Sequence, residues 1–368
     1  MRVILTVFLI FLSNYCNACL WDRDTYAMEK QKFPNAFELM TGNFDRHSNS
    51  YYQWRIAKIQ PQIDKGSKDP LLFDDLAVAY SKLGDDKKAI ALMKQKEKFA
   101  PNLYETYANL GTFYIHDGQF EEGLIYINKA IKINPDAHFG REIYQKYLVE
   151  FILLNKKNKS ETNNFYSFLT KKYNTKNNLK DTFLPEIENE KAVKGVLGMM
   201  RFGNYNSPIL LKALGDLLLA DSYDTPSAKR LATMAYMASD IYSIGSVSIK
   251  TKENAQMYLS MQERDKNTYE ELLKEVNKGI QIGKKRYIDI GKKETNWVLK
   301  NKDLDVEFAK DFYKKTNSTN KNNFAQNNQN GITKKEEKNS NKLIIGLIIS
   351  MIMIVIIVII KLRKNTFD

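Results

Sequence analysis

A 34-residue period between residues 70 and 137 limits the possible folds more than any other feature of this sequence. An aromatic residue, a glycine and a proline recur one period apart, as Phe73, Gly84 and Pro101 and then as Tyr107, Gly118 and Pro135. Glycine often ends a helix because it adopts a left-handed conformation without strain, and proline cannot continue a helix. Each period therefore predicts two helices joined by a glycine turn.

Small residues also recur at this period. Each predicted helix carries one of them, at Ala77 and Ala89 in the first copy and at Gly111 and Gly123 in the second. Small side chains let paired helices approach closely, and the bulky residues beside them form stripes at helical spacing. Such stripes must be buried against a neighbouring repeat, so the sequence predicts stacked helical hairpins.

This pattern resembles the tetratricopeptide repeat in its period and in its helix–turn–helix arrangement. The resemblance implies an all-α fold, a right-handed superhelix whose concave face, lined by the first helices, binds segments of partner proteins. It covers residues 70–103 and 104–137 well and residues 208–242 weakly. The stretches CLWDRDT and FGREIYQ also resemble exported, membrane-anchored bacterial repeat proteins that have no assigned activity.

The resemblance further implies which side chains line the partner-binding groove. These are Asp74, Val78, Ser81, Glu105, Ala108, Asn109, Thr112 and His116. Family members that bind chaperones clamp a terminal carboxylate with lysine and asparagine, but Asp74 and Val78 stand at two of those positions and only Asn109 matches. An acidic rim suits a basic or polar partner better than a carboxylate.

Further helices are predicted on both sides of the repeats. A helix at residues 51–63 would cover the first repeat, and a helix that begins near residue 141 would cover the second. Beyond Ser207–Pro208, the spacing of Leu211, Leu214 and Gly215 predicts a third, degenerate hairpin, whose second helix begins at Thr225–Pro226. An amphipathic stripe from Tyr269 predicts a long helix that reaches back towards Lys252.

The two ends predict where the protein resides. Residues 1–18 have the charge, apolar run and small residues of a secretory signal, with cleavage before Cys19; a lipid anchor on Cys19 is the alternative. Residues 343–360 are almost wholly apolar and would span about 27 Å as a helix, close to the thickness of a bilayer core. Basic residues from Lys361 onwards predict a cytoplasmic tail.

The predicted organisation follows the chain in eight parts. These are a signal peptide (1–18), an N-terminal cap region (19–69), the repeats with a capping helix (70–154), a polar loop and helical connection (155–206), a second helical block (207–315), an Asn- and Lys-rich disordered tether (316–342), a transmembrane helix (343–360) and a cytoplasmic tail (361–368). Residues 19–342 are accordingly expected outside the cytoplasm, in the periplasm, on a single-pass membrane protein.

The composition argues against several classes of function and site. The formal net charge is +13, but no dense basic block with interleaved aromatic residues occurs, so nucleic acid is not an expected partner. The two cysteines, Cys16 and Cys19, cannot build a disulfide framework or a four-ligand zinc site. Asp22 and Asp24 lack further clustered ligands, so a solvated or salt-bridged cap is predicted for them. His47 has no second histidine nearby, so a surface or hydrogen-bonded role is predicted for it.

No catalytic residue, metal or cofactor is predicted, because the sequence has no glycine-rich phosphate loop, no histidine pair with metal spacing and no nucleophile elbow. The leading hypothesis is a membrane-anchored scaffold of the cell envelope that binds an unidentified protein partner. The alternatives are an enzyme with a site on the second helical block, and electrostatic attachment to an anionic polymer or lipid.

Overall fold

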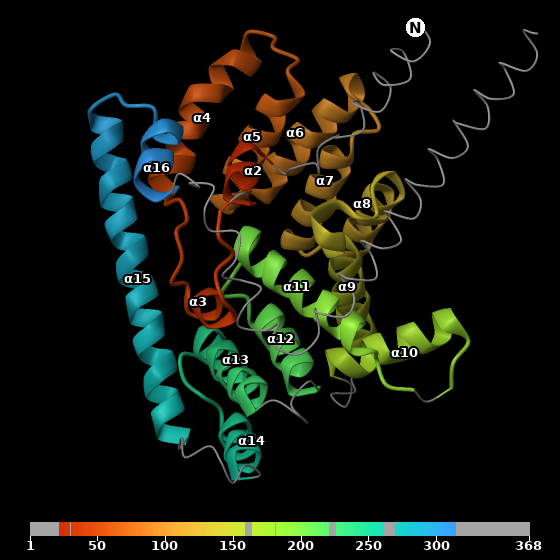
Figure 1. Ribbon diagram of the computed structural model, residues 1–368. Coiled ribbons are helices and arrows are strands. Elements are labelled where there is room, and N and C mark those ends of the chain that lie inside the picture. Colours follow the sequence, from red (N-terminus) through yellow and green to blue (C-terminus); the bar gives the residue numbers. More distant parts are fainter. Residues whose placement is uncertain are drawn as a thin grey trace, which may run out of the picture. The chain divides into compact units, whose positions relative to one another are not determined.

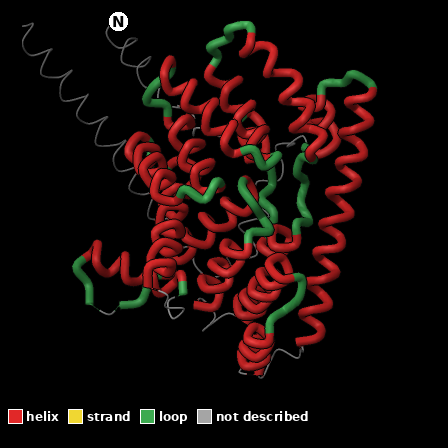
Figure 2. Tube along the Cα trace, turned by 180° about the vertical axis from the view of Figure 1, so that it is seen from behind, coloured by secondary structure: helices red, strands yellow, loops and turns green. Residues whose placement is uncertain are grey.

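The computed structural model describes residues 22–29, 31–158, 164–180, 182–220, 226–260 and 269–313. All the regular secondary structure in these ranges is helical (Figures 1 and 2). The helices are α2 (Arg23–Glu29), α3 (Ala36–Thr41), α4 (Asn49–Asp64), α5 (Pro70–Lys82), α6 (Asp86–Phe99), α7 (Tyr104–His116), α8 (Phe120–Ile133), the 3-10 helix η1 (Ala137–Gly140), α9 (Arg141–Asn158), α10 (Phe165–Asn177), α11 (Glu186–Phe202), α12 (Pro208–Ala220), α13 (Pro226–Ile244), α14 (Ile249–Ser260), α15 (Tyr269–Leu299) and α16 (Leu304–Phe312).

The predicted signal peptide, tether, transmembrane segment and cytoplasmic tail, together with Cys19, lie outside the described residues. Within the described ranges, no helix is both long enough and apolar enough to cross a membrane. The membrane segment at residues 343–360 therefore stays a prediction.

The two predicted repeats are confirmed as helical hairpins. Helix α5 packs against α6, and α7 packs against α8. Gly84 and Gly118 end the first helix of each hairpin with φ of 88° and 81°, the left-handed values expected from their positions. Asp69 caps α5 by accepting a hydrogen bond from the Leu71 amide, and Pro70 occupies the first turn, where its missing amide hydrogen costs nothing.

The helices predicted on either side of the repeats are also present. Helix α4 packs on α5, and α9 packs on α8. Ile59 and Ile63 of α4 join Phe73 and Leu76 in one buried cluster, so α4 covers the apolar face that the first repeat would otherwise expose. Helix α9 continues to Asn158, so the predicted polar loop begins later than residue 155.

The second block contains the predicted degenerate hairpin, formed by α12 and α13. Leu211 and Leu214 of α12 and Ala232 and Ala235 of α13 are fully buried in a cluster to which α3, α10 and α11 also contribute. The small residue at Gly215 matters here, since a Cβ at this position would lie 2.7 Å from the Tyr236 ring. The hairpin therefore uses the same close-packing device as the repeats.

The predicted extension of the long helix towards Lys252 is wrong. Helix α15 begins at Tyr269, and the separate helix α14 packs against both α13 and α15. The stripe of Tyr269, Leu272, Val276 and Ile280 is buried as expected. Helix α15 passes α13, α3, α4 and α16, and thereby links the second block to the helix that covers the first repeat (Figure 1).

Candidate functional site

The structure separates the eight predicted groove residues into an interior group and an accessible group. The interior group is Asp74, Val78, Ala108, Asn109 and Thr112, and the accessible group is Ser81, Glu105 and His116. Ser81 and His116 lie together at the ends of α5 and α7, with 3.5 Å between Ser81 Oγ and His116 Nδ1. Binding of a partner by these residues stays a prediction, and only the accessible group is open to one in this structure.

The Asp74 carboxylate is enclosed by an ion pair. Lys96 Nζ, on α6, donates to both of its oxygens at 2.7 and 2.6 Å, and Asn109 Nδ2, on α7, donates to one of them at 3.1 Å. Burial raises the pKa of Asp74, and the ammonium group of Lys96 opposes that rise. Because this carboxylate is internal and neutralised, Asp74 adds no charge to an acidic rim, contrary to expectation.

The protein's own chain covers the rest of the predicted groove. Lys82 Nζ, at the end of α5, donates to the carbonyl oxygens of Phe202 and Gly203 at 2.6 and 2.9 Å, which holds the end of α11 against the first repeat. Phe202 belongs to the same buried cluster as Val78 and Ala108. On α9, Gln145 Nε2 donates to Thr112 Oγ1 at 3.1 Å. The concave face is thus largely occupied from within the chain.

A buried ionic network surrounds His47, in the segment between α3 and α4. Its Nδ1 lies 2.6 Å from Glu294 Oε1 on α15, and its Nε2 lies 3.0 Å from Asp24 Oδ1 on α2. The ring stacks on Tyr51 with 3.4 Å between centroids. Burial alone would lower the pKa of His47, but the carboxylates of Asp24 and Glu294 outweigh burial and raise this pKa to about 9.

Asp22 and Asp24 are salt-bridged, which is one of the two roles predicted for them. Asp22 Oδ2 accepts a hydrogen bond from Arg55 Nη1 at 2.7 Å, and its other oxygen accepts from the Thr25 amide at 2.7 Å. Burial would raise the pKa of Asp24, but His47 lowers it to about 2, so this carboxylate is ionised at neutral pH. No group of three or more His, Cys, Asp or Glu in the described ranges could hold a metal ion.

The raised pKa of His47 predicts a loss of stability at alkaline pH. A histidine whose pKa is higher in the folded than in the unfolded protein stabilises the fold fully below about pH 6.5, and this contribution is lost as pH rises through about 9. We expect the free energy of unfolding to fall by roughly 2 kcal/mol between pH 7 and pH 9 because of His47. Urea titrations across this range measure the decrease in the free energy of unfolding, which should be at most half as large in His47→Gln as in the parent protein. An equal decrease in both proteins would contradict the raised pKa of His47.

A cavity of about 520 Å³ remains beside the covered groove. Its walls come from α2, the segment between α3 and α4, the start of α4, α5, the end of α11 with the loop after it, and α15. Val78 is the predicted groove residue that reaches it. Cavities of this size commonly hold small molecules.

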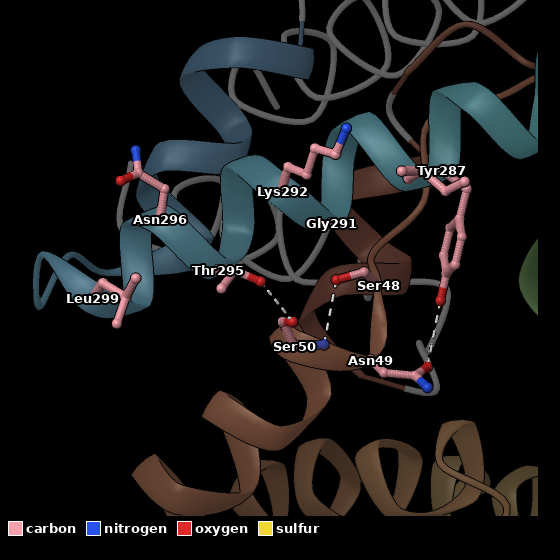
Figure 3. A pocket seen from close by; sticks show the side chains of 10 residues that line it. Ser48, Asn49, Ser50, Tyr287, Gly291, Lys292, Thr295, Asn296 and Leu299 are labelled. Atoms are coloured by element: carbon pink, nitrogen blue, oxygen red, sulfur yellow. Dashed lines mark hydrogen bonds between the residues drawn. The ribbon is translucent and has the colours of Figure 1, made fainter.

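A second hollow, of about 510 Å³, lies between the start of α4 and α15 (Figure 3). Ser50 Oγ and Thr295 Oγ1 are 3.0 Å apart across it, and the Tyr287 hydroxyl lies 3.4 Å from Asn49 Oδ1 (Figure 3). Lys292 is the charged residue in its lining. These side chains join α4 to α15, and the hollow lacks the buried charges that distinguish the first cavity.

Comparison with known proteins assigns one part of the chain. Residues 104–137, the α7–α8 hairpin and the turn after it, match the family model described as Tetratricopeptide repeat. These are the bounds predicted for the second repeat. The match supports protein–protein interaction as the general role of this region. No curated protein matches the chain.

Proposed function

We propose that this chain is a membrane-tethered scaffold of the cell envelope, which binds a protein partner at the accessible edge of its two tetratricopeptide hairpins. The repeat match at residues 104–137 supports the binding of a protein partner. The apolar run at residues 343–360, with basic residues after it, supports the tether. Confinement to a membrane raises the local concentration of a partner in the same layer, so a modest affinity suffices.

The binding edge is chosen because only part of the predicted groove is accessible. Among the eight predicted groove residues, Ser81, Glu105 and His116 are the ones that the covering helices leave accessible. Asp86 lies beside two of them, since its Oδ1 accepts a hydrogen bond from Ser81 Oγ at 2.5 Å and is 3.7 Å from His116 Nδ1. Glu105 lies in the first turn of α7, at the opposite end of this helix from His116. The proposed edge therefore extends along α7 and has a carboxylate near each end, which suits an extended partner segment with hydroxyl, amide or basic groups.

Site-specific crosslinking tests this proposal. A photoreactive residue at His116 of the full chain should capture one protein from intact membranes, whereas the same residue at Lys132, exposed on α8, should not. Glu105→Lys should reduce capture at His116, because it reverses a charge on the proposed edge. Equal capture from both positions, or capture unchanged by Glu105→Lys, would overturn the edge. A chain that ends at residue 342 should leave the membrane fraction, and its retention there would overturn the tether.

A further inference from the structure

In the lining of the cavity beside the first repeat, positively charged side chains outnumber negatively charged ones. Four cationic side chains contribute to its lining besides His47: Arg46, Lys82, Arg201 and Lys284. Lys82 already holds the carbonyl groups at the end of α11, where a cation is favourable to the helix dipole. Arg46 likewise donates to the Gly42 carbonyl oxygen at the end of α3, and Arg201 to the Met28 carbonyl oxygen in the last turn of α2. Neither of them, nor Lys284, makes an ion pair with a carboxylate in the described part of the chain.

Arg201 is the most constrained of these three. It lies in the last turn of α11 and is only 7% exposed. Its Nη2 donates to the Met28 carbonyl oxygen at 2.7 Å, while its Nε has no hydrogen-bond partner among the described residues. Buried charges in proteins are normally paired, because an unpaired one loses its hydration without compensation. Glu29 acts on Arg201 electrostatically but is not part of the cavity lining.

Arg46 and Lys284 extend the positive charge from the interior to the surface. The Arg46 guanidinium lies over the rings of Tyr205 and Tyr287, 4.4 and 4.7 Å from their centroids, and makes no ion pair with a described carboxylate. Lys284 is exposed on α15 and likewise makes no ion pair in the described part of the chain. The cavity thus combines donors for an anion with aromatic walls.

The carboxylates of the cavity do not neutralise these cations. Asp22 is held by Arg55, and Asp24 by His47. Both carboxylates therefore already have a positive partner at hydrogen-bond distance. The remaining excess of positive charge is available to a ligand.

We propose that this cavity binds a compact organic anion, whose carboxylate or phosphate group pairs with Arg46, Arg201 and Lys284 and whose apolar body packs against Tyr205 and Tyr287. The cavity volume of about 520 Å³ suits a small molecule better than an extended acidic peptide. This site is separate from the accessible edge proposed for a protein partner, so it does not rest on that proposal.

Calorimetric titration of the full chain in detergent, at constant ionic strength, tests the site. The probes are phenyl phosphate and phenylacetate, with 2-phenylethanol as the neutral counterpart and hexaglutamate as the acidic peptide. We expect saturable binding of at least one aromatic anion at one site per chain, and the stronger of the two identifies the preferred anionic group. The neutral alcohol should bind at least about tenfold more weakly, since it cannot pair with the cations.

Two adjacent lysines of α15 provide a matched comparison. Lys284→Gln removes a cation from the lining and should weaken anion binding about tenfold. Lys285→Gln removes the charge of a lysine that is also exposed but does not contribute to the lining, and should change binding less than about twofold. Arg201→Gln should weaken binding at least as much as Lys284→Gln, measured where its circular dichroism matches that of the parent. The proposal is overturned if neither aromatic anion saturates the site, if both lysine variants weaken binding equally, or if only hexaglutamate binds.

Discussion

Replacing Gly283 by alanine is expected to destabilise the protein by about 3 kcal/mol, although alanine normally favours a helix. Gly283 lies on α15 where this helix crosses the end of α3. A Cβ at this position would overlap the carbonyl oxygen of Thr41 and lie 2.7 Å from the carbonyl carbon of Gly42. These atoms cannot move aside easily, because Gly42 ends α3 with φ of 71° and donates to the Glu38 and Leu39 carbonyl oxygens.

Gly291→Ala is the matched control, since it makes the same substitution two turns further along α15. A Cβ there would lie 3.3 Å from Ser48 Cβ, so a shift of a few tenths of an ångström would relieve the contact. We expect a change within about 1 kcal/mol, and the higher helix propensity of alanine offsets part of any crowding. Urea titration of both variants and of the parent protein measures their free energies of unfolding. Equal destabilisation by the two substitutions would show that α15 does not approach α3 as closely as described.

The repeats could be predicted from the sequence because their determinants are local. Gly84 and Gly118 end helices through their own backbone conformation, and the stripes that contain Phe73 and Tyr107 are complete within one hairpin. The matched bounds of the second repeat, residues 104–137, equal those read from the 34-residue period. Helix type and hairpin pairing therefore need no knowledge of distant residues.

The covering of the groove could not be predicted, because it depends on residues far away in the sequence. Lys82 meets the end of α11, which is 120 residues further along the chain, and His47 meets Glu294 at a separation of 247 residues. No local pattern encodes such pairs. Assigning groove residues from the repeat alone therefore assumed an open concave face, and this chain occupies most of that face itself.

The sequence nevertheless shows that two charged residues, Glu294 and Lys96, lie on apolar stripes. Glu294 lies four residues after Ile290 and three before Trp297, and thus on the buried stripe of α15. Lys96 continues the stripe of Ala89 and Met93 on α6. A charge on an apolar stripe indicates a buried partner, since an unpaired charge there would be costly. The position of the charge is therefore visible in the sequence, but the identity of its partner is not.

The second large effect on stability is expected when the buried ion pair between Asp74 and Lys96 is broken. Asp74→Asn leaves the Lys96 ammonium group buried, with 1% of its side chain exposed, beside an uncharged amide. Removal of one partner of a buried pair costs about 3–5 kcal/mol, because the remaining charge keeps its desolvation penalty and loses its counter-charge. We expect a decrease of this size in the free energy of unfolding, measured by urea titration. Asp311→Asn, which breaks the exposed pair with Lys293, should cost less than about 1 kcal/mol.

The double variant Asp74→Leu with Lys96→Met separates the charge effect from the effect of packing. Both charges are then absent, and two apolar side chains of similar length fill the space between α5 and α6, so most of the lost stability should return. Recovery stays incomplete because Asn109 Nδ2 loses the acceptor that Asp74 provides at 3.1 Å. A double variant as unstable as Asp74→Asn would mean that shape and hydrogen bonding hold this junction between the two repeats. A stable Asp74→Asn protein would mean that Lys96 can reach solvent, and that the first repeat has an open concave face after all.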